Sequence, residues 1–321
     1  MGTKLNSYLR LLGAHHILCM NRRNARYIAP GNPRQHYRLV DEKIRTKTLA
    51  AEAHVPCPET YGVVTYYGEI TRILTRVTTT YNTFVIKPNR GAAGRGVLVL
   101  ERDKDGTWRK PSGAHVGTMD LHFHVTSILS GLYSLSELPD QTLIEQRIFP
   151  HVFFKDIAYG GTPDVRVILF RTVPVMAMMR LPTKRSDGRA NLHQGAVGLG
   201  VAIATGITRA AVCHNDHITR HPDTGANLLG LQVPDWPAAV DAARRLATHI
   251  PLKYIGVDLM LDAQHGPMMI EANARPGLNI QVANNTGLRP RLEFLQALFA
   301  RGATADQAWA ELYPRIAADT L

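Results

Sequence analysis

The stretch GVDLMLDAQHGPMMIEANARPG, residues 256–277, decides the fold that we expect for this chain. Apolar and polar residues alternate in its first arm, and the glycine-containing middle suits a hairpin turn. If Asp258 pairs with Glu271, two carboxylates share one face of the ribbon, with Asn273 two residues further along. Like charges directly opposite destabilise a sheet, and Mg²⁺ relieves this because it prefers oxygen ligands. The stretch therefore predicts a magnesium site; a solvated acidic hairpin fits poorly with such apolar neighbours.

The composition limits the classes of protein to consider. The chain has 321 residues, 45% of them hydrophobic, which is enough to bury a substantial core. Its formal net charge of +11 favours acidic partners, such as nucleotide phosphates, acidic peptides, anionic lipid or nucleic acid. No motif supports specific nucleic-acid binding, and no apolar run approaches the roughly 20 residues that span a membrane. The three cysteines are scattered, so we expect reduced thiols in a cytoplasmic protein.

Strands and helices mix along the chain without regular βαβ alternation, which predicts an α+β fold with mainly antiparallel sheets. We expect helices over residues 42–53, 122–132, 237–249, 290–300 and 304–313. We expect strands over 62–67, 72–79, 83–87, 97–101, 107–110, 142–148, 164–170 and 175–181, and hairpins over 210–220 and 255–273.

The run FVIKPNRGAAGRGVLV, residues 84–99, predicts a strand, a glycine-rich loop and a second strand. Glycines such as Gly94 and Gly96 let backbone N–H groups approach phosphates closely, and Lys87 can add a positive charge there. The loop is followed by a strand and lacks a GK[ST] sequence. It is therefore neither a Walker A loop nor a dinucleotide fingerprint, both of which open a helix. Taken alone, a flexible hairpin tip explains it as well as a phosphate clamp.

Other polar residues lie at strand ends, on one helix face and in one loop, and each also has an ordinary interpretation as protein surface. They are Lys43 and Lys47 four residues apart on a helix, Glu145, Gln146 and Arg147 at a strand end, Asp164 and Arg166 on one face of a strand, Arg180 in the next strand, and Arg189 and Asn191 in a loop.

Two groups of histidines invite a metal interpretation that the spacing does not support. Cys213, His214, His217 and His221 superficially resemble a zinc site. They fall in an expected hairpin with the turn sequence 222–225, so we interpret them as ordinary hairpin residues. His115, His122 and His124 receive the same interpretation.

The order of these motifs resembles the ATP-grasp superfamily. The run RANLHQG at 189–195 and the pair GVD and EANARPGL within 256–278 are most similar to its ribosomal-protein glutamate ligase branch. The runs MNRRN, NPR and DEKIRTK, which start at residues 20, 32 and 41, resemble the bacterial alpha-L-glutamate ligase-like proteins. The resemblance spans nearly the whole chain, and the ordered set is specific although each motif is weak.

This resemblance implies an ATP-grasp fold, in which two α+β lobes with mainly antiparallel sheets clasp ATP. The lobes would cover residues 41–148, with a glycine-rich lid, and 149–321, after an N-terminal extension at 1–40. The implied cofactors are ATP and Mg²⁺, or Mn²⁺ in its place. The resemblance also implies a role for each group of residues. The phosphates would be contacted by Lys43 and Lys87, the lid would contain Gly94, Arg95 and Gly96, and the adenine would be lined by Glu145, Gln146 and Arg147. The nucleotide would be faced by Asp164, Arg166 and Arg180, the γ-phosphate and acyl group would be approached by Arg189 and Asn191, and Mg²⁺ would be held by Asp258, Glu271 and Asn273.

Two departures from the family pattern concern the substrates. The glutamate ligases carry a sizeable domain ahead of the first lysine, whereas 42 residues precede Lys43 here, which leaves the acceptor open. Arg275 follows the metal motif, where the resemblance predicts no particular charge. Strand alternation would put it on the face of Glu271 and Asn273, where a guanidinium could bind a substrate carboxylate. The alternative is that Arg275 balances the acidic site or packs outward.

We therefore expect an ATP-dependent carboxylate–amine ligase. A substrate carboxylate would attack the γ-phosphoryl group of ATP, and an amine would then displace phosphate from the acyl phosphate to form an amide. The basic chain suits amino-acid or peptide substrates that are acidic. The alternatives are an ATP-grasp enzyme that modifies a protein tail, a nucleotide-binding regulatory module without turnover, and a nucleic-acid binder supported by charge alone.

Overall fold

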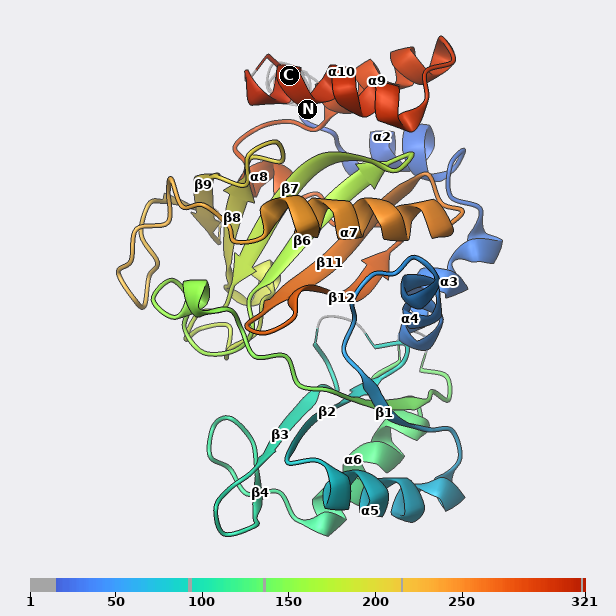
Figure 1. The fold of residues 1–321 in the computed structure, drawn as a ribbon, viewed down its shortest axis with the longest axis vertical. Coiled ribbons are helices and arrows are strands. Elements are labelled where there is room, and N and C mark those ends of the chain that lie inside the picture. The colour runs from blue at the N-terminus through green and yellow to red at the C-terminus, as the bar shows by residue number, and fades with distance from the viewer. Residues whose placement is uncertain (1–15, 92–93, 135–136, 215, 319) are drawn as a thin grey trace, which may run out of the picture. The chain divides into compact units, whose positions relative to one another are not determined.

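The computed structural model describes residues 16–91, 94–134, 137–214, 216–318 and 320–321. These residues form two compact units, which we call the large and the small unit. The large unit contains residues up to Val40, Thr48–Pro56 and Phe149–Leu321, and the small unit contains Asp41–Lys47 and Cys57–Ile148. Each unit combines helices with an antiparallel sheet, so the α+β prediction is confirmed (Figure 1).

The small unit is built on a five-stranded antiparallel sheet in the order β1-β5-β2-β3-β4. Its core is formed by strand residues such as Phe84 and Ile86 together with helix residues such as Val77, Val125 and Ile128, all essentially without solvent exposure. The elements are β1 (Thr60–Val64), η3 (Tyr67–Glu69), α5 (Ile70–Thr80), β2 (Thr83–Pro88), β3 (Leu98–Arg102), β4 (Trp108–Arg109), α6 (Thr118–Leu129) and β5 (Thr142–Glu145). Helix α4 (Lys43–Glu52) has residues in both units.

The strand that we expected at residues 72–79 is wrong, because this segment belongs to helix α5. Its many threonines and β-branched residues favour a strand by intrinsic propensity. However, Ile70, Ile73, Leu74 and Val77 recur at helical spacing, and all four are buried. Burial of this apolar stripe against the sheet outweighs propensities that differ by less than about 1 kcal/mol per residue.

The large unit is built on a seven-stranded antiparallel sheet in the order β10-β9-β8-β7-β6-β11-β12. Hairpin β11–β12 lies at one edge, next to β6. The strands are β6 (Asp164–Phe170), β7 (Val173–Leu181), β8 (Val197–Val201), β9 (Thr208–Cys213), β10 (Asp216–Ile218), β11 (Tyr254–Asp262) and β12 (Gly266–Asn273). The turn between β9 and β10 follows Cys213, where His214 has a positive φ of 59°. The turn that we expected at 222–225 is also present but is separate from this hairpin: Gly225 N–H donates to His221 O at 2.9 Å, and Arg220 forms an antiparallel bridge with Asn227.

Helix α7 (Trp236–His249) lies across one face of this sheet, over β6, β7, β11 and β12 (Figure 1). Its buried stripe includes Trp236, Ala239, Ala243 and Leu246, which follow helical spacing. The remaining helical segments are α2 (Met20–Arg23), η1 (Asn24–Ile28), η2 (Arg34–His36), α3 (Arg38–Asp41), η4 (Val152–Phe154), η5 (Leu192–Gln194), α8 (Ile280–Ala283), α9 (Arg289–Ala300) and α10 (Ala305–Ala317). Among the described helices, none combines the length and apolarity that a membrane span requires.

Candidate functional site

The hairpin β11–β12 brings three predicted metal ligands together. Asp258 pairs directly with Glu271, and Asn273 pairs with Gly256, so the predicted register is confirmed. The Asn273 Nδ2 atom lies 3.2 Å from Glu271 Oε1 and 3.4 Å from Asp258 Oδ2. All three side chains therefore share one face, where a cation would meet carboxylate and amide oxygens.

Two arginines and a further aspartate extend this face across the neighbouring strands. Arg166 on β6 pairs with Asp258 on β11, and Asp164 pairs with Arg180 on β7. Arg166 donates from Nε and Nη2 to the two oxygens of Asp258, at 2.7 and 2.5 Å. Arg180 donates to Asp164 from Nε at 2.6 Å and also to Asp258 Oδ2 at 2.9 Å. We call Asp164, Arg166, Arg180, Asp258, Glu271 and Asn273 the polar row.

The two aspartates of the polar row are buried, its other members are partly buried, and its charges nearly balance. Asp258 is only 1% exposed. Burial opposes its ionisation, but the adjacent guanidiniums of Arg166 and Arg180 outweigh burial and lower the pKa of Asp258 below its usual range. Burial raises the pKa of Asp164, and repulsion from Asp258 adds to this against the attraction of Arg180. With three carboxyl groups ionised, the row carries a net charge of −1, which leaves it receptive to one more cation.

The polar row fits a hard divalent cation at its Glu271 end. Asn273 donates from Nδ2 to both carboxyl groups, which leaves its Oδ1 atom as an acceptor for a metal. Asp258 differs from the simple prediction, because both of its oxygens already accept hydrogen bonds from arginines. Those same guanidiniums have planar donor geometry that also suits phosphate oxygens.

Backbone contacts from outside the hairpin hold its open end. Asn32 donates to the carbonyl oxygens of Tyr254 and Ala274, at 2.6 and 2.9 Å, and accepts from Tyr254 N at 3.0 Å. Gly256 lies on the face of Asp258, and a Cβ atom there would sit 2.8 Å from the Cβ of Pro276. A glycine at 256 therefore lets the chain after β12 fold back over the strand. The sequence singled out Asn32 only as the first residue of the run NPR.

A buried cluster in the small unit contains Lys87, a predicted phosphate contact, and Lys47, to which we assigned no role from the sequence. Glu145 on β5 forms ion pairs with Lys87 on β2 and with Lys47 on α4. The Nζ atom of Lys47 lies 2.7 Å from Glu145 Oε2. Lys47 also donates to the carbonyl of Pro58 at 2.5 Å. Burial opposes ionisation of Glu145, but Lys87 and Lys47 together hold its pKa below the usual range. Lys47 lies on the same helix face as Lys43, so the four-residue spacing was the available signal.

Lys43 lies at the base of the glycine-rich loop. Its Nζ atom donates to the Gly91 carbonyl at 2.7 Å, and its backbone N–H donates to Asn89 O at 3.1 Å. Gly96 has a φ of 72°, and its carbonyl lies 3.0 Å from His124 Nε2. Gly94 has the same positive φ and is exposed, as is Arg95. Ala92 and Ala93, also in the predicted lid, lie outside the described residues.

Three predicted residues at the end of β5 have different surroundings. Glu145 faces the lysines described above. Gln146 bonds to Glu59 through its backbone N–H, at 2.8 Å, and through its side-chain Oε1 atom, at 3.1 Å. Arg147 forms an ion pair with Glu101 on β3. Their predicted role at an adenine ring stays a prediction.

The loop between β7 and β8 holds Arg189 and Asn191 away from any bonded contact with the polar row. Asn191 caps the short helix η5, because its Oδ1 atom accepts from His193 N at 3.0 Å. The Arg189 side chain is exposed, and its backbone N–H donates to Ser186 O at 3.0 Å. Among the described residues, neither side chain makes a hydrogen bond or ion pair with the row. Their predicted catalytic role stays a prediction.

Arg275 is positioned by a contact with an aromatic ring and not by strand alternation as we expected. Strand β12 ends at Asn273, so strand alternation does not extend to Arg275. Its guanidinium instead lies over the ring of Tyr37, 5.2 Å from the ring centroid. The side chain is exposed, and Tyr37 comes from the segment that precedes Lys43.

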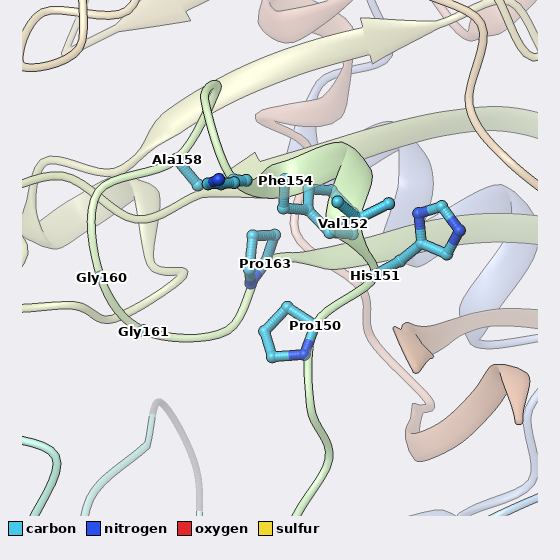
Figure 2. A pocket seen from close by; sticks show the side chains of 9 residues that line it. Pro150, His151, Val152, Phe154, Ala158, Gly160, Gly161 and Pro163 are labelled. Carbon is cyan, nitrogen blue, oxygen red and sulfur yellow. The ribbon is translucent and has the colours of Figure 1, made fainter. Parts of the chain in front are cut away.

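A cavity of about 410 Å³ lies on the segment between β5 and β6 (Figure 2). This volume is in the range of small-ligand sites. Gly161, in its wall, has a φ of 58°, and a Cβ atom there would lie 1.8 Å from Gly188 O, so the cavity segment touches the loop that carries Arg189. Sequence reasoning missed this cavity. It is lined by Pro150, His151, Val152, Phe154, Lys155, Ala158, Gly160, Gly161 and Pro163.

His221, from the group that superficially resembles a zinc site, is held by backbone contacts. His221 is buried, and its Nδ1 atom accepts from the backbone N–H groups of Asp223 and Thr224, at 3.2 and 3.3 Å. Across the described residues, no group of three or more His, Cys, Asp and Glu side chains could hold a metal ion.

Comparisons with known proteins identify the fold. The model of the sugar-transfer associated ATP-grasp family matches residues 22–297. Phosphoribosylamine–glycine ligase from Thermotoga maritima has a similar structure, with a TM-score of 0.52 at 12% identity over 90% of this chain and 62% of that chain. This similarity supports the predicted ATP-grasp fold. No curated protein matches the chain.

Two further solved structures are more distant in shape. D-cycloserine synthetase DcsG has a TM-score of 0.45 at 18% identity, with 84% of this chain and 72% of that chain covered. The ATP-grasp ligase PsnB, complexed with minimal precursor, Mg and ADP, has a TM-score of 0.47 at 13% identity, with 85% and 62% covered. The chain thus spans less than two thirds of the length of PsnB.

Proposed function

The chain belongs to the sugar-transfer associated ATP-grasp family, and we propose that it is an ATP-dependent carboxylate–amine ligase. ATP-grasp ligases bind ATP and Mg²⁺, as the PsnB complex with Mg and ADP illustrates. The observation that carries the proposal is the polar row, in which Asp258, Glu271 and Asn273 adjoin two partly buried guanidiniums on one face of a sheet. Oxygen ligands beside arginines suit a metal ion bound to phosphates.

In the proposed reaction, a substrate carboxylate oxygen attacks the γ-phosphorus of ATP, and the bond to the β-phosphate oxygen breaks to release ADP. The amine then attacks the acyl carbon, loses a proton and displaces inorganic phosphate. Asp258, Glu271 and Asn273 would hold Mg²⁺, which neutralises phosphate charge when bound. Arg166 and Arg180 would stabilise the equatorial oxygens of the transferring group, because fixed donors in a buried site need no reorganisation.

The small unit would contribute cations for the phosphates. Lys87 and Lys43 are the predicted contacts, and the ion pairs of Lys47 and Lys87 with Glu145 support adding Lys47 to them. The glycine-rich loop with Gly94, Arg95 and Gly96 would close over the nucleotide and exclude water, which would otherwise hydrolyse the acyl phosphate. Adenine contacts by Glu145, Gln146 and Arg147, and an approach of Arg189 and Asn191 to the γ-phosphate, remain part of this proposal.

We propose acidic amino acids or acidic peptides as substrates. The net charge of +11 and the resemblance to glutamate ligases support this class. The proposal keeps two lobes at 41–148 and 149–321 with an extension at 1–40. A cytoplasmic location is also part of it, and the three free cysteines support that location.

The test is to incubate the protein with Mg-ATP, amino-acid pools and a peptide library, and to look for mass gains accompanied by ADP. Glu271→Gln and Asn273→Ala should abolish turnover, and Asp306→Asn, at a residue whose side chain is 89% exposed, serves as the matched control. AMP and pyrophosphate as products would contradict the mechanism. ATP binding without any turnover would favour the regulatory module, and mass gain only on intact proteins would favour the modification of a protein tail.

The alternative that this protein binds nucleic acid is tested by measuring oligonucleotide binding at different salt concentrations. If the positive charge serves anionic substrates, oligonucleotides should bind weakly and be released by modest salt, as nonspecific phosphate contacts are. Nanomolar, sequence-selective binding at physiological salt would contradict the ligase proposal.

A further inference from the structure

The segment that precedes helix α4 and Lys43, residues 16–40, packs directly against the chain on both sides of Arg275. Asn32 donates to the Ala274 carbonyl at 2.9 Å, and Arg23 donates from Nη1 to the Pro276 carbonyl at 2.8 Å. Tyr37 lies beneath the guanidinium of Arg275. The exit from the metal-ligand strand β12 is therefore built jointly by the C-terminal hairpin and this N-terminal segment.

Arg23 is a buried cation whose partners are all neutral. It is 7% exposed, and its Nε and Nη2 atoms donate to Asn24 Oδ1 at 3.1 and 2.9 Å. Among the described residues, no carboxylate forms an ion pair with it. Burial lowers the pKa of Arg23, and the nearby positive charge of Arg275 lowers it further against the influence of Tyr254 and Tyr37. A buried charge without a counter-ion is costly, so an anion beside it would be stabilised.

Arg275 presents the donors that such an anion needs. Its guanidinium carbon lies 5.2 Å from the centroid of the Tyr37 ring, and a guanidinium held over an aromatic ring still has N–H donors for a carboxylate. The side chain is exposed, and across the described part of the chain no carboxylate pairs with it. The charges of Arg23 and Arg275 are therefore close enough to affect each other, and among the described residues no carboxylate forms an ion pair with either side chain.

We propose that Arg275 binds a carboxylate of the substrate, with Tyr37 as a positioning residue that orients Arg275 and with the buried Arg23 adding positive charge behind it. This inference rests on the proposed ligase function. Asn273 and Arg275 are two residues apart, which limits their Cα separation to roughly 7 Å. A dicarboxylate spans a gap of that order, so one carboxylate would react beside the polar row while the other binds Arg275. The substrate class is thus a dicarboxylic amino acid or a peptide that carries one.

The first test uses the acid that the turnover screen identifies and separates KM from kcat. Tyr37→Leu and Arg275→Lys should raise the KM for the acid by about 10- to 100-fold, as expected for a lost charge-assisted contact, with kcat and ATP affinity changed less than about threefold. Tyr37→Phe keeps the ring and should rescue the KM. Arg22→Met is the matched control, because Arg22 neighbours Arg23 but pairs with Glu293 on the surface.

A second test requires no turnover and therefore separates this inference from the proposed function. Glutarate should bind the wild-type protein in calorimetric titrations more tightly than acetate at equal ionic strength, and Arg275→Ala should lose that preference. Binding that survives Arg275→Ala, or equal binding of inorganic phosphate, would overturn the carboxylate subsite. If glutarate binding depends on Arg275 and no ADP ever forms, the subsite stands and the ligase proposal fails.

Discussion

Replacing Asp258 with asparagine should destabilise the large unit, even though it removes one of two facing carboxylates. Considered as an isolated hairpin, the change would relieve repulsion with Glu271 and stabilise the protein. The sheet reverses this expectation, because Asp258 accepts both side-chain contacts that Arg166 makes and one from Arg180. Asparagine leaves the Arg166 guanidinium buried without a carboxylate, whereas Arg180 keeps Asp164.

The magnitude follows from burial and from the number of partners. Asp258 is 1% exposed, and removing one member of a buried ion pair costs about 3–5 kcal/mol. Relief of the repulsion between residues 258 and 271 stabilises the protein by at most about 1 kcal/mol. We therefore expect a net loss of about 2–4 kcal/mol in the free energy of unfolding. Glu271→Gln should cost less than Asp258→Asn, because Glu271 is half-buried whereas Asp258 is almost fully buried.

The assay is urea unfolding at pH 7 without Mg²⁺, followed by circular dichroism and tryptophan fluorescence. Asp306→Asn controls for the loss of one surface carboxylate. Equal stability of Asp258→Asn and the wild type, or equal losses for Asp258→Asn and Glu271→Gln, would refute the argument that the arginines dominate the electrostatics of Asp258.

Three further predictions concern other parts of the structure. Glu145→Gln leaves Lys47 and Lys87 facing each other without a counter-ion, and should cost about 3 kcal/mol in urea unfolding while weakening ATP binding in titrations. Gly256→Ala puts a Cβ atom 2.8 Å from Pro276 Cβ and should lower stability by about 1–3 kcal/mol, measured as a lower midpoint of thermal unfolding. Burial lowers the pKa of His124, so the unfolded chain binds its proton first, and stability should fall as the pH drops below about 6.5; His124→Gln should flatten this pH dependence.

The local patterns of the sequence were sufficient for the hairpin and for the fold class. The alternation in residues 256–277 has a period of two, so pairing Asp258 with Glu271 follows once the turn is located. The antiparallel α+β architecture likewise follows from strands that recur without regular βαβ alternation. Even the helix over Ile70–Thr80 carried its signal in the spacing of Ile70, Ile73, Leu74 and Val77, which strand propensity obscured.

Only the tertiary structure decided which charges meet. Arg180 lies 78 residues from Asp258 in the sequence, and no local pattern indicates that the two strands flank β6 closely enough for their side chains to bond. The same holds for Lys47 and Glu145, 98 residues apart, and for Tyr37 beneath Arg275. The hydrophobic periodicity of a strand predicts which of its side chains face the core. This holds for any strand order, because the apolar face of the strand is buried whichever strands lie beside it. The partners of a charged group depend on strand order and loop path, which the long-range packing of the whole chain determines.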